Sequence, residues 1–147
     1  MVRGKFLTGV LLGFLALLAS SQVFAQADKR QALMKNNSEA VKAIRAAVDA
    51  KDYATIEAKA RDIMGNADKI VGFFPKGSNT GKTKAKSEIW DKFDDFSKNP
   101  TKLKIAATEL ADAAKAKDDG AVTVKVKALG DVCGSCHKAF RAEKYAE

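Results

Sequence analysis

The sequence predicts an all-α protein, an antiparallel four-helix bundle with up-down-up-down connections. Only two prolines, Pro75 and Pro100, occur among the 147 residues, and alanine and lysine, which both favour helices, are abundant. No stretch shows the sustained alternation of apolar and polar residues that indicates a strand. Four segments instead carry apolar residues at steps of three and four, and together they fit one domain at residues 26–147.

The first two predicted helices cover residues 27–50 and 52–74. The first carries Met34, Val41, Ile44 and Val48 at helical spacing. The second has the most regular apolar pattern of the chain, formed by Ile56, Ala60, Ile63, Ala67, Ile70 and Phe74. Asp52 is a residue type that caps helix N-termini, so we expect the second helix to begin there. The turn between the two helices is short, which makes them antiparallel neighbours.

The third predicted helix begins near Ser87 and continues to residue 113. Its apolar residues are Ile89, Trp90, Phe93, Phe96, Leu103, Ala106, Leu110 and Ala113. Pro100 lies inside it, and because proline lacks an N–H and clashes with the preceding turn, we expect a break or kink after Lys98 or Asn99. A turn-rich loop at residues 75–83 separates it from the second helix.

The fourth predicted helix covers residues 121–144, after a short turn at residues 118–120. Its apolar side is formed by Val122, Val126, Leu129, Cys133, Cys136 and Phe140, again at steps of three and four. The two cysteines therefore share the face that packs into the core.

Residues 1–25 have the features of a secretory signal peptide. A basic start with Arg3 and Lys5 precedes a largely apolar stretch at residues 6–19, and small residues follow. That stretch is shorter than the roughly 20 residues that span a bilayer, so we expect cleavage, after Ala25 or after Ala27, rather than a membrane anchor. The remaining chain has no other long apolar run, which predicts a soluble bacterial periplasmic protein with no membrane association after cleavage.

Residues 133–137 read Cys-Gly-Ser-Cys-His and contain both cysteines and the only histidine of the chain. This CxxCH pattern attaches c-type haem: each thiol can add to one haem vinyl group as a thioether, and the histidine supplies an imidazole to the iron. On a helix, the spacing places Cys133, Cys136 and His137 on one face. The motif predicts one covalently bound haem c per chain, and in bacteria this haem is attached after export.

The two cysteines could also serve purposes other than haem attachment. A thioredoxin-like redox pair would lie at a helix N-terminus just after a strand, where the helix dipole lowers the thiol pKa. A structural zinc site needs four ligands, and one is missing. A disulfide between Cys133 and Cys136, in a helical bundle without haem, stays open, although it leaves the adjacent His137 unexplained.

The charge balance is basic but dispersed. The full chain has 26 Lys and Arg against 18 Asp and Glu, and without Arg3 and Lys5 the mature chain has 24 against 18, a formal net charge of +6. Lysines spread along helical faces indicate a solvated surface, and the alternative is a basic rim that steers an acidic redox partner. Arginine and aromatic residues do not cluster, so no nucleic-acid partner is expected.

With CxxCH on the last of four helices, the sequence resembles the class II cytochromes c, which include cytochrome c′ and its low-spin relatives. The resemblance is carried by Arg30-Gln31-Ala32-Leu33-Met34, Phe73-Phe74-Pro75, Glu88-Ile89-Trp90 with Phe93, and residues 133–141. It implies a haem in the bundle core, attached by Cys133 and Cys136, with His137 as the proximal iron ligand. It also implies that Arg30 and Gln31 contact the haem, the arginine through a propionate.

The resemblance gives position 34 a special meaning. In cytochrome c′ this position holds a residue that cannot bind the iron, which is then five-coordinate, whereas low-spin relatives have a methionine that binds it. This chain has Met34 there, and a thioether is a known axial partner opposite histidine. Met34 is therefore the expected sixth ligand, and the alternative is five-coordinate iron with Met34 only packed above it.

Two functions follow from these alternatives. The leading one is single-electron transfer in the periplasm with redox partner proteins, and the other is binding of NO or CO at five-coordinate iron. No enzyme is expected, because the only histidine is used by the iron and no nucleophile and base are left as a pair. The resemblance also allows a homodimer through the first two helices.

Overall fold

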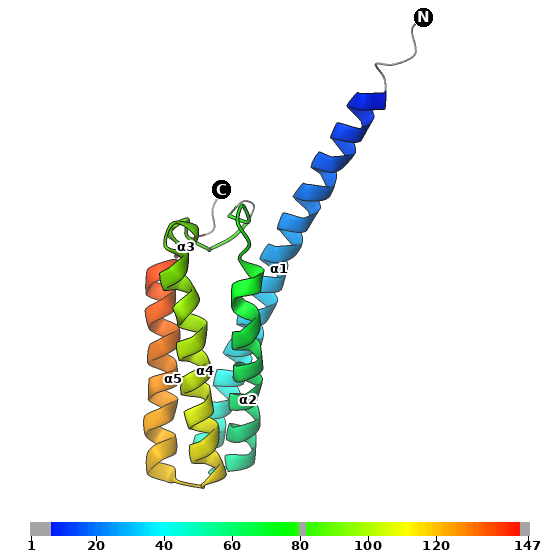
Figure 1. Ribbon diagram of the computed structural model, residues 1–147. Coiled ribbons are helices and arrows are strands. Elements are labelled where there is room, and N and C mark those ends of the chain that lie inside the picture. Colours follow the sequence, from blue (N-terminus) through cyan, green and yellow to red (C-terminus); the bar gives the residue numbers. More distant parts are fainter. Residues whose placement is uncertain (1–6, 80–81, 145–147) are drawn as a thin grey trace, which may run out of the picture.

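The computed structural model describes residues 7–79 and 82–144, with side chains from Gln26 onward. In this part of the chain, four long helices are α1 (Leu7–Asp49), α2 (Tyr53–Ile70), α4 (Phe93–Lys115) and α5 (Asp119–Phe140). The short η1 (Val71–Phe73) and α3 (Glu88–Asp91) belong to the connection between α2 and α4. The long helices run alternately up and down (Figure 1), which confirms the predicted all-α, antiparallel four-helix bundle.

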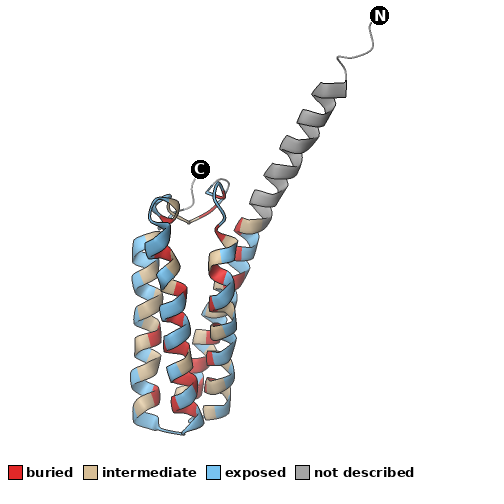
Figure 2. Ribbon diagram, viewed as in Figure 1, coloured by how far each residue is buried: buried red, intermediate tan, exposed pale blue. Residues whose placement is uncertain are grey.

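The hydrophobic core lies along the inward faces of the helices (Figure 2). The predicted apolar pattern of α2 is confirmed, because Ile56, Ala60, Ile63, Ala67 and Ile70 are all buried. Each buried aliphatic side chain of Val or Ile size contributes about 1.5–3 kcal/mol to folding. α2 packs most extensively against α4, while α1 and α5 contact each other little. The bundle is therefore tightly filled on one side and leaves space between α1 and α5.

The two turns at one end of the bundle repeat the same local structure. Lys51 and Lys117, which follow the ends of α1 and α4 by two residues, both lie in the left-handed backbone region, with φ of 52° and 56°. The next residue caps the following helix: Asp52 Oδ1 accepts from the Thr55 N–H at 3.0 Å, and Asp118 Oδ1 accepts from the Ala121 N–H at 2.9 Å. The start of the second helix at Asp52 is thus confirmed, while α5 begins two residues before its predicted start.

A break or a kink was expected at Pro100, and the break is wrong, since α4 continues through this residue. Proline cannot donate to the Phe96 carbonyl four residues earlier, and this usually ends a helix. Here the Asn99 side-chain amide donates to that carbonyl at 3.1 Å and to the Asp95 carbonyl at 2.9 Å. The break lies instead at Lys92, where φ is −123° and ψ is 45°, and it separates α3 from α4.

The last helix ends at Phe140 rather than at residue 144 because the following chain pairs with the long loop. The Lys86 N–H donates to the Phe140 carbonyl at 3.1 Å, and the Ala142 N–H donates to the Lys84 carbonyl at 2.8 Å. The side chain of Lys86 also donates to the carbonyls of Lys138 and Ala139, at 3.3 and 3.5 Å. A cation at this position suits the negative end of the α5 dipole.

The predicted signal peptide includes residues 1–6, which lie outside the described part of the chain. Both expected cleavage points, after Ala25 and after Ala27, fall within the continuous helix α1. The signal peptide and its cleavage stay predictions. Over the residues that the structure describes, no helix is both long and apolar enough to cross a membrane.

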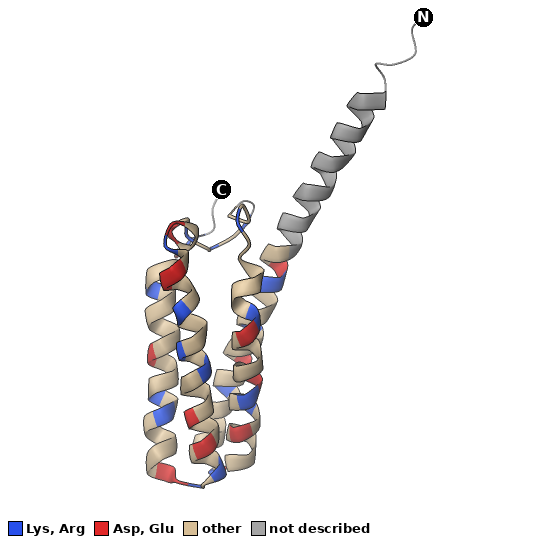
Figure 3. Cartoon of the chain, in the orientation of Figure 1, with Lys and Arg blue, Asp and Glu red and all other residues tan. Residues whose placement is uncertain are grey.

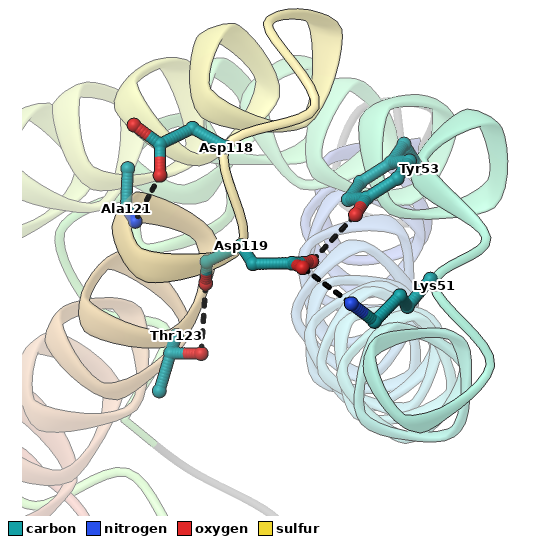
Figure 4. A network of polar contacts seen from close by, with 6 residues as sticks. All are labelled: Lys51, Tyr53, Asp118, Asp119, Ala121 and Thr123. Carbon is teal, nitrogen blue, oxygen red and sulfur yellow. Dashed lines mark hydrogen bonds and ion pairs between the residues drawn. The ribbon is translucent and has the colours of Figure 1, made fainter.

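A polar network joins the two turns at the end of the bundle (Figure 4). The Asp119 carboxylate, at the start of α5, accepts hydrogen bonds from the Lys51 ammonium and the Tyr53 hydroxyl. The hydrogen bond from Lys51, followed by that from Tyr53, lowers the pKa of Asp119 below its ordinary value. The same contact with Asp119 raises the pKa of Lys51. The ionised carboxylate therefore ties the α1–α2 turn to the α4–α5 turn.

We expect the variant Asp119→Asn to melt at a lower temperature than the wild type at pH 7, by a small margin, because exposed ion pairs contribute little. The lowered folded-state pKa means that the stabilisation is fully present above the unfolded pKa of about 4 and is lost as the pH falls through the folded value. Thermal melts from pH 7 to pH 2 should therefore show the two proteins converging below about pH 4.

The matched control is Asp112→Asn, which changes an exposed carboxylate on α4 that has no ion pair among the described residues. Its melting curve should follow the wild type at every pH. A difference between Asp119→Asn and wild type that persists at pH 2 would show that the effect does not come from the ionised carboxylate.

Candidate functional site

A cavity of about 320 Å³ lies between α1, α4 and α5. Its walls are mostly apolar, and it falls within the size range of small-molecule and cofactor sites. α1 contributes Met34, Asn37, Ser38, Val41, Lys42 and Arg45; α2 contributes Ile70; α4 contributes Phe96, Asn99, Pro100 and Leu103; α5 contributes Gly130, Val132, Cys133, Cys136 and His137. The residues from α1 recur at steps of three and four, so one face of that helix forms one wall.

The predicted attachment residues are brought together in this cavity. Cys133, Cys136 and His137 lie on α5 and all three line the cavity. The two thiols are free and are not joined as a disulfide. Burial raises the pKa of both thiols, and for Cys136 the neighbouring Cys133 adds to the effect. A redox-active pair needs the opposite shift, so these thiols lack the activation that a thioredoxin-like site requires.

His137 is suited to act as a metal ligand through its neutral form. His137 is an exposed residue, yet desolvation of its ring on the cavity side lowers its pKa, and the positive charge of Arg141, one turn later, lowers it further. Neutral imidazole is the form that binds iron. The sequence identifies Arg141 only as the last residue of the 133–141 segment, and its effect on the histidine follows from their i, i+4 placement at the end of α5.

Met34 lines the same cavity from α1. The fold thus brings its thioether to the cavity that also contains His137, although the two residues are about a hundred positions apart in the sequence. Met34 is partly buried and packs against the core. Met64, on α2, also packs against the core but is not among the residues that line the cavity.

Arg30 and Gln31 do not line this cavity and instead hold the loop after α2. The buried Arg30 guanidinium donates to Ser78 Oγ at 3.2 Å and to the Ser78 carbonyl at 3.0 Å, and it lies 4.8 Å from the centre of the Phe74 ring. Burial lowers the pKa of Arg30. Gln31 Nε2 donates to the Lys82 carbonyl at 3.3 Å. Their contact with a haem stays a prediction, and Arg30 Nε, which is buried without a partner, is one donor available for it.

The residues of the cavity fit a flat apolar macrocycle with covalent attachment. Two unpaired thiols and a neutral imidazole project from one helix, and apolar side chains from α4 face them. Gly130 also lines the cavity, and a Cβ built there would meet nothing within 4 Å, so open space borders the backbone at this point. In the described part of the chain, no group of three or more His, Cys, Asp or Glu is arranged to hold a metal ion directly.

Several cavity residues were not singled out from the sequence. Asn37, Lys42 and Arg45 lie on the helical face of Met34, so the periodicity of α1 could have identified them. Asn99 and Pro100 gave no such signal, because the helix was expected to break there. Figure 3 shows that basic and acidic positions are interspersed along the helices, as expected for a solvated surface. Lys42 and Arg45 are the basic residues that line the cavity itself.

Comparison with known proteins gave consistent matches over most of the chain. The family model described as Cytochrome C′ matches residues 25–141. Cytochrome c′ of Rhodospirillum rubrum is 31% identical over 145 residues, covering 91% of this chain and 97% of that protein. Cytochrome c-556 of Agrobacterium fabrum is 33% identical over 145 residues, covering 95% of this chain and 97% of that protein.

Solved structures agree with the sequence matches. Cytochrome c′ from Rhodopseudomonas palustris superposes with a TM-score of 0.74 at 30% identity, over 81% of this chain and 97% of that one. A cytochrome c′ with an unusual ligand-controlled dimer dissociation superposes with a TM-score of 0.75 at 28% identity, over 81% of this chain and 95% of that one.

Proposed function

The chain belongs to the cytochrome c′ family of c-type haem proteins, and on that premise we propose that it carries single electrons in the periplasm, with His137 and Met34 as the two axial ligands of its covalent haem c. The observation that carries the proposal is that Met34 and His137 line one cavity from different helices. A histidine and a methionine together would fill both axial positions, so that no coordination position is left for a substrate.

Each residue has a separate part in this proposal. Cys133 and Cys136 would attach the haem, and the lowered pKa of His137 keeps its imidazole in the form that can bind iron. Bound at this site, the haem supplies a one-electron couple, whose potential is raised by a thioether ligand. Val41, Phe96 and Leu103 form apolar walls that would surround the bound haem and limit its contact with water.

The proposed location and partners rest on the sequence and on the surface of the cavity. Residues 1–25 have the pattern of a cleaved export signal, and bacterial c-type haem is attached after export. Lys42 and Arg45 line the cavity, and positive charge beside a redox centre favours the approach of a partner protein with an acidic face. We assign no enzymatic activity, because the only histidine has a role on the iron.

A homodimer through α1 and α2 is part of the proposal. A groove between these helices is lined by small residues, Ala40, Ala43 and Gly65, as well as by charged ones. Small side chains allow helices of a second copy to approach closely. The cytochrome c′ of known structure that dissociates under ligand control is a dimeric precedent with the same fold.

The second candidate function is capture of NO or CO at five-coordinate iron. It is favoured by the partial burial of Met34 against the core, which is how a packing methionine behaves. It also agrees with the similarity to proteins named cytochrome c′.

The optical spectrum of the purified holoprotein tests the two candidates. A low-spin spectrum with the weak near-infrared band of methionine sulfur on ferric iron is the expected result. A high-spin spectrum, with ready binding of CO by the reduced protein, would reject electron transfer through a His–Met haem and support the second candidate.

A further inference from the structure

Two side-chain amides line the cavity, Asn37 from α1 and Asn99 from α4. A carboxamide can both donate through its NH₂ group and accept through its carbonyl oxygen. Both amides already form hydrogen bonds within the bundle, Asn37 through its carbonyl oxygen and Asn99 through its NH₂ group. The two amides therefore present different chemistry to whatever occupies the cavity.

Asn99 has its donor group engaged. Its Nδ2 donates to the carbonyls of Asp95 and Phe96, the bonds that carry α4 through Pro100. The carbonyl oxygen is the part of this amide left for another contact. Asn99 is therefore an acceptor, fixed in place by the backbone of its own helix.

Asn37 has the opposite arrangement. Its Oδ1 accepts a hydrogen bond from Asn66 Nδ2 on α2 at 2.8 Å, in a partly buried position between the two helices. Its own Nδ2 forms no hydrogen bond with the described residues and is still accessible to solvent at the cavity. Asn37 is therefore a donor whose orientation is set by Asn66.

The donor lies beside Met34. Asn37 follows Met34 by three residues on α1, so the two side chains are neighbours on one helical face, and both line the cavity. A thioether sulfur is a weak acceptor with few other partners in an apolar cavity. An unpaired N–H next to it gains most by donating to that sulfur or to another electron-rich group at the same place.

We propose that Asn37, held by Asn66, donates a hydrogen bond to the electron-rich ligand on the α1 side of the haem iron. This inference rests on the proposed function, in which that ligand is the Met34 sulfur. Asn37 is then a positioning residue that acts on the iron through the ligand. The positive end of its N–H dipole disfavours the more highly charged ferric state, so it raises the reduction potential.

The test replaces Asn37 by leucine, which has a similar volume but no donor, and measures the reduction potential of the holoprotein by spectroelectrochemical titration. We expect Asn37→Leu to keep the near-infrared methionine band and to shift the potential downward. Asn66→Ala leaves every cavity-lining side chain unchanged but frees Asn37 to rotate, and should give a smaller shift in the same direction.

The matched control is Asn36→Leu, which changes the neighbouring exposed asparagine, not among the cavity residues, and should leave the potential unchanged. A potential in Asn37→Leu equal to that of the wild type and the control overturns the proposal. If Asn37→Leu does not retain haem, the potential of Asn66→Ala decides in the same way.

A wild-type spectrum without the methionine band would reject Met34 as the ligand, and the donor is then tested with CO bound to the reduced protein. A donor to the CO oxygen lowers the C–O stretching frequency. A higher frequency in Asn37→Leu than in both the wild type and Asn36→Leu supports the proposal, and equal frequencies overturn it. The role of Asn37 and the ligation by Met34 are thus tested separately.

Discussion

Replacing Cys133 and Cys136 together by serine should give a protein that loses its haem on denaturing electrophoresis, while the wild-type chain keeps it. The reason is chemical: thioether attachment needs sulfur, and these are the only cysteines of the chain. Both thiols line the cavity and neither is used in a disulfide. Haem staining of the gel, compared with total protein, measures the loss, which should be complete.

Each single variant, Cys133→Ser or Cys136→Ser, should keep some haem through the remaining thioether. Ser135→Ala is the matched control, because Ser135 lies between the cysteines, is exposed, and only donates to the Val132 carbonyl at 3.0 Å. It should stain like the wild type. Stain retained by the double variant would contradict thioether attachment, and a colourless wild type from a host with a working maturation system would favour the disulfide alternative.

The fold followed from the sequence wherever the signal was local and repeated. The apolar steps of α2, and the capping aspartate at its start, depend only on residues close together in the chain. Pro100 shows where such reasoning fails. The general rule that proline ends a helix was overridden by one neighbouring side chain, Asn99, whose amide replaces the missing backbone donor. The actual break, at Lys92, has no comparable signal in the sequence.

The residues of the candidate site also fall into those that local sequence patterns predict and those that they do not. Cys133, Cys136 and His137 are close in sequence, so their shared face follows from helical spacing alone. Placing Met34 opposite them needed a family resemblance, because no local pattern relates α1 to α5. The pairing of Asn37 with Asn66 depends on how α1 and α2 are rotated against each other, which the sequence does not specify. Arg30 was predicted as a haem contact, and this stays a prediction; in the structure the residue is buried and its visible partner is Ser78 in a loop.

Met34→Leu should change the protein from an electron carrier toward a protein that binds NO or CO at five-coordinate iron. Leucine and methionine have similar volumes, so the packing of the core should change by less than about 1.5 kcal/mol. Leucine has no lone pair, however, and cannot bind iron. We expect the variant to lose the near-infrared methionine band, to become high-spin, and to bind CO readily when reduced, as measured by absorbance spectroscopy of the ferric and ferrous forms.

Met64→Leu is the matched control, since Met64 has the same side chain, also packs against the core, and lies outside the cavity lining. It should keep the wild-type spectrum in both oxidation states. If Met34→Leu also kept it, Met34 would be a packing residue, and the sixth position would be either open or filled by another group. Because both substitutions remove a thioether from a partly buried site, only ligation of the iron predicts that the two spectra differ.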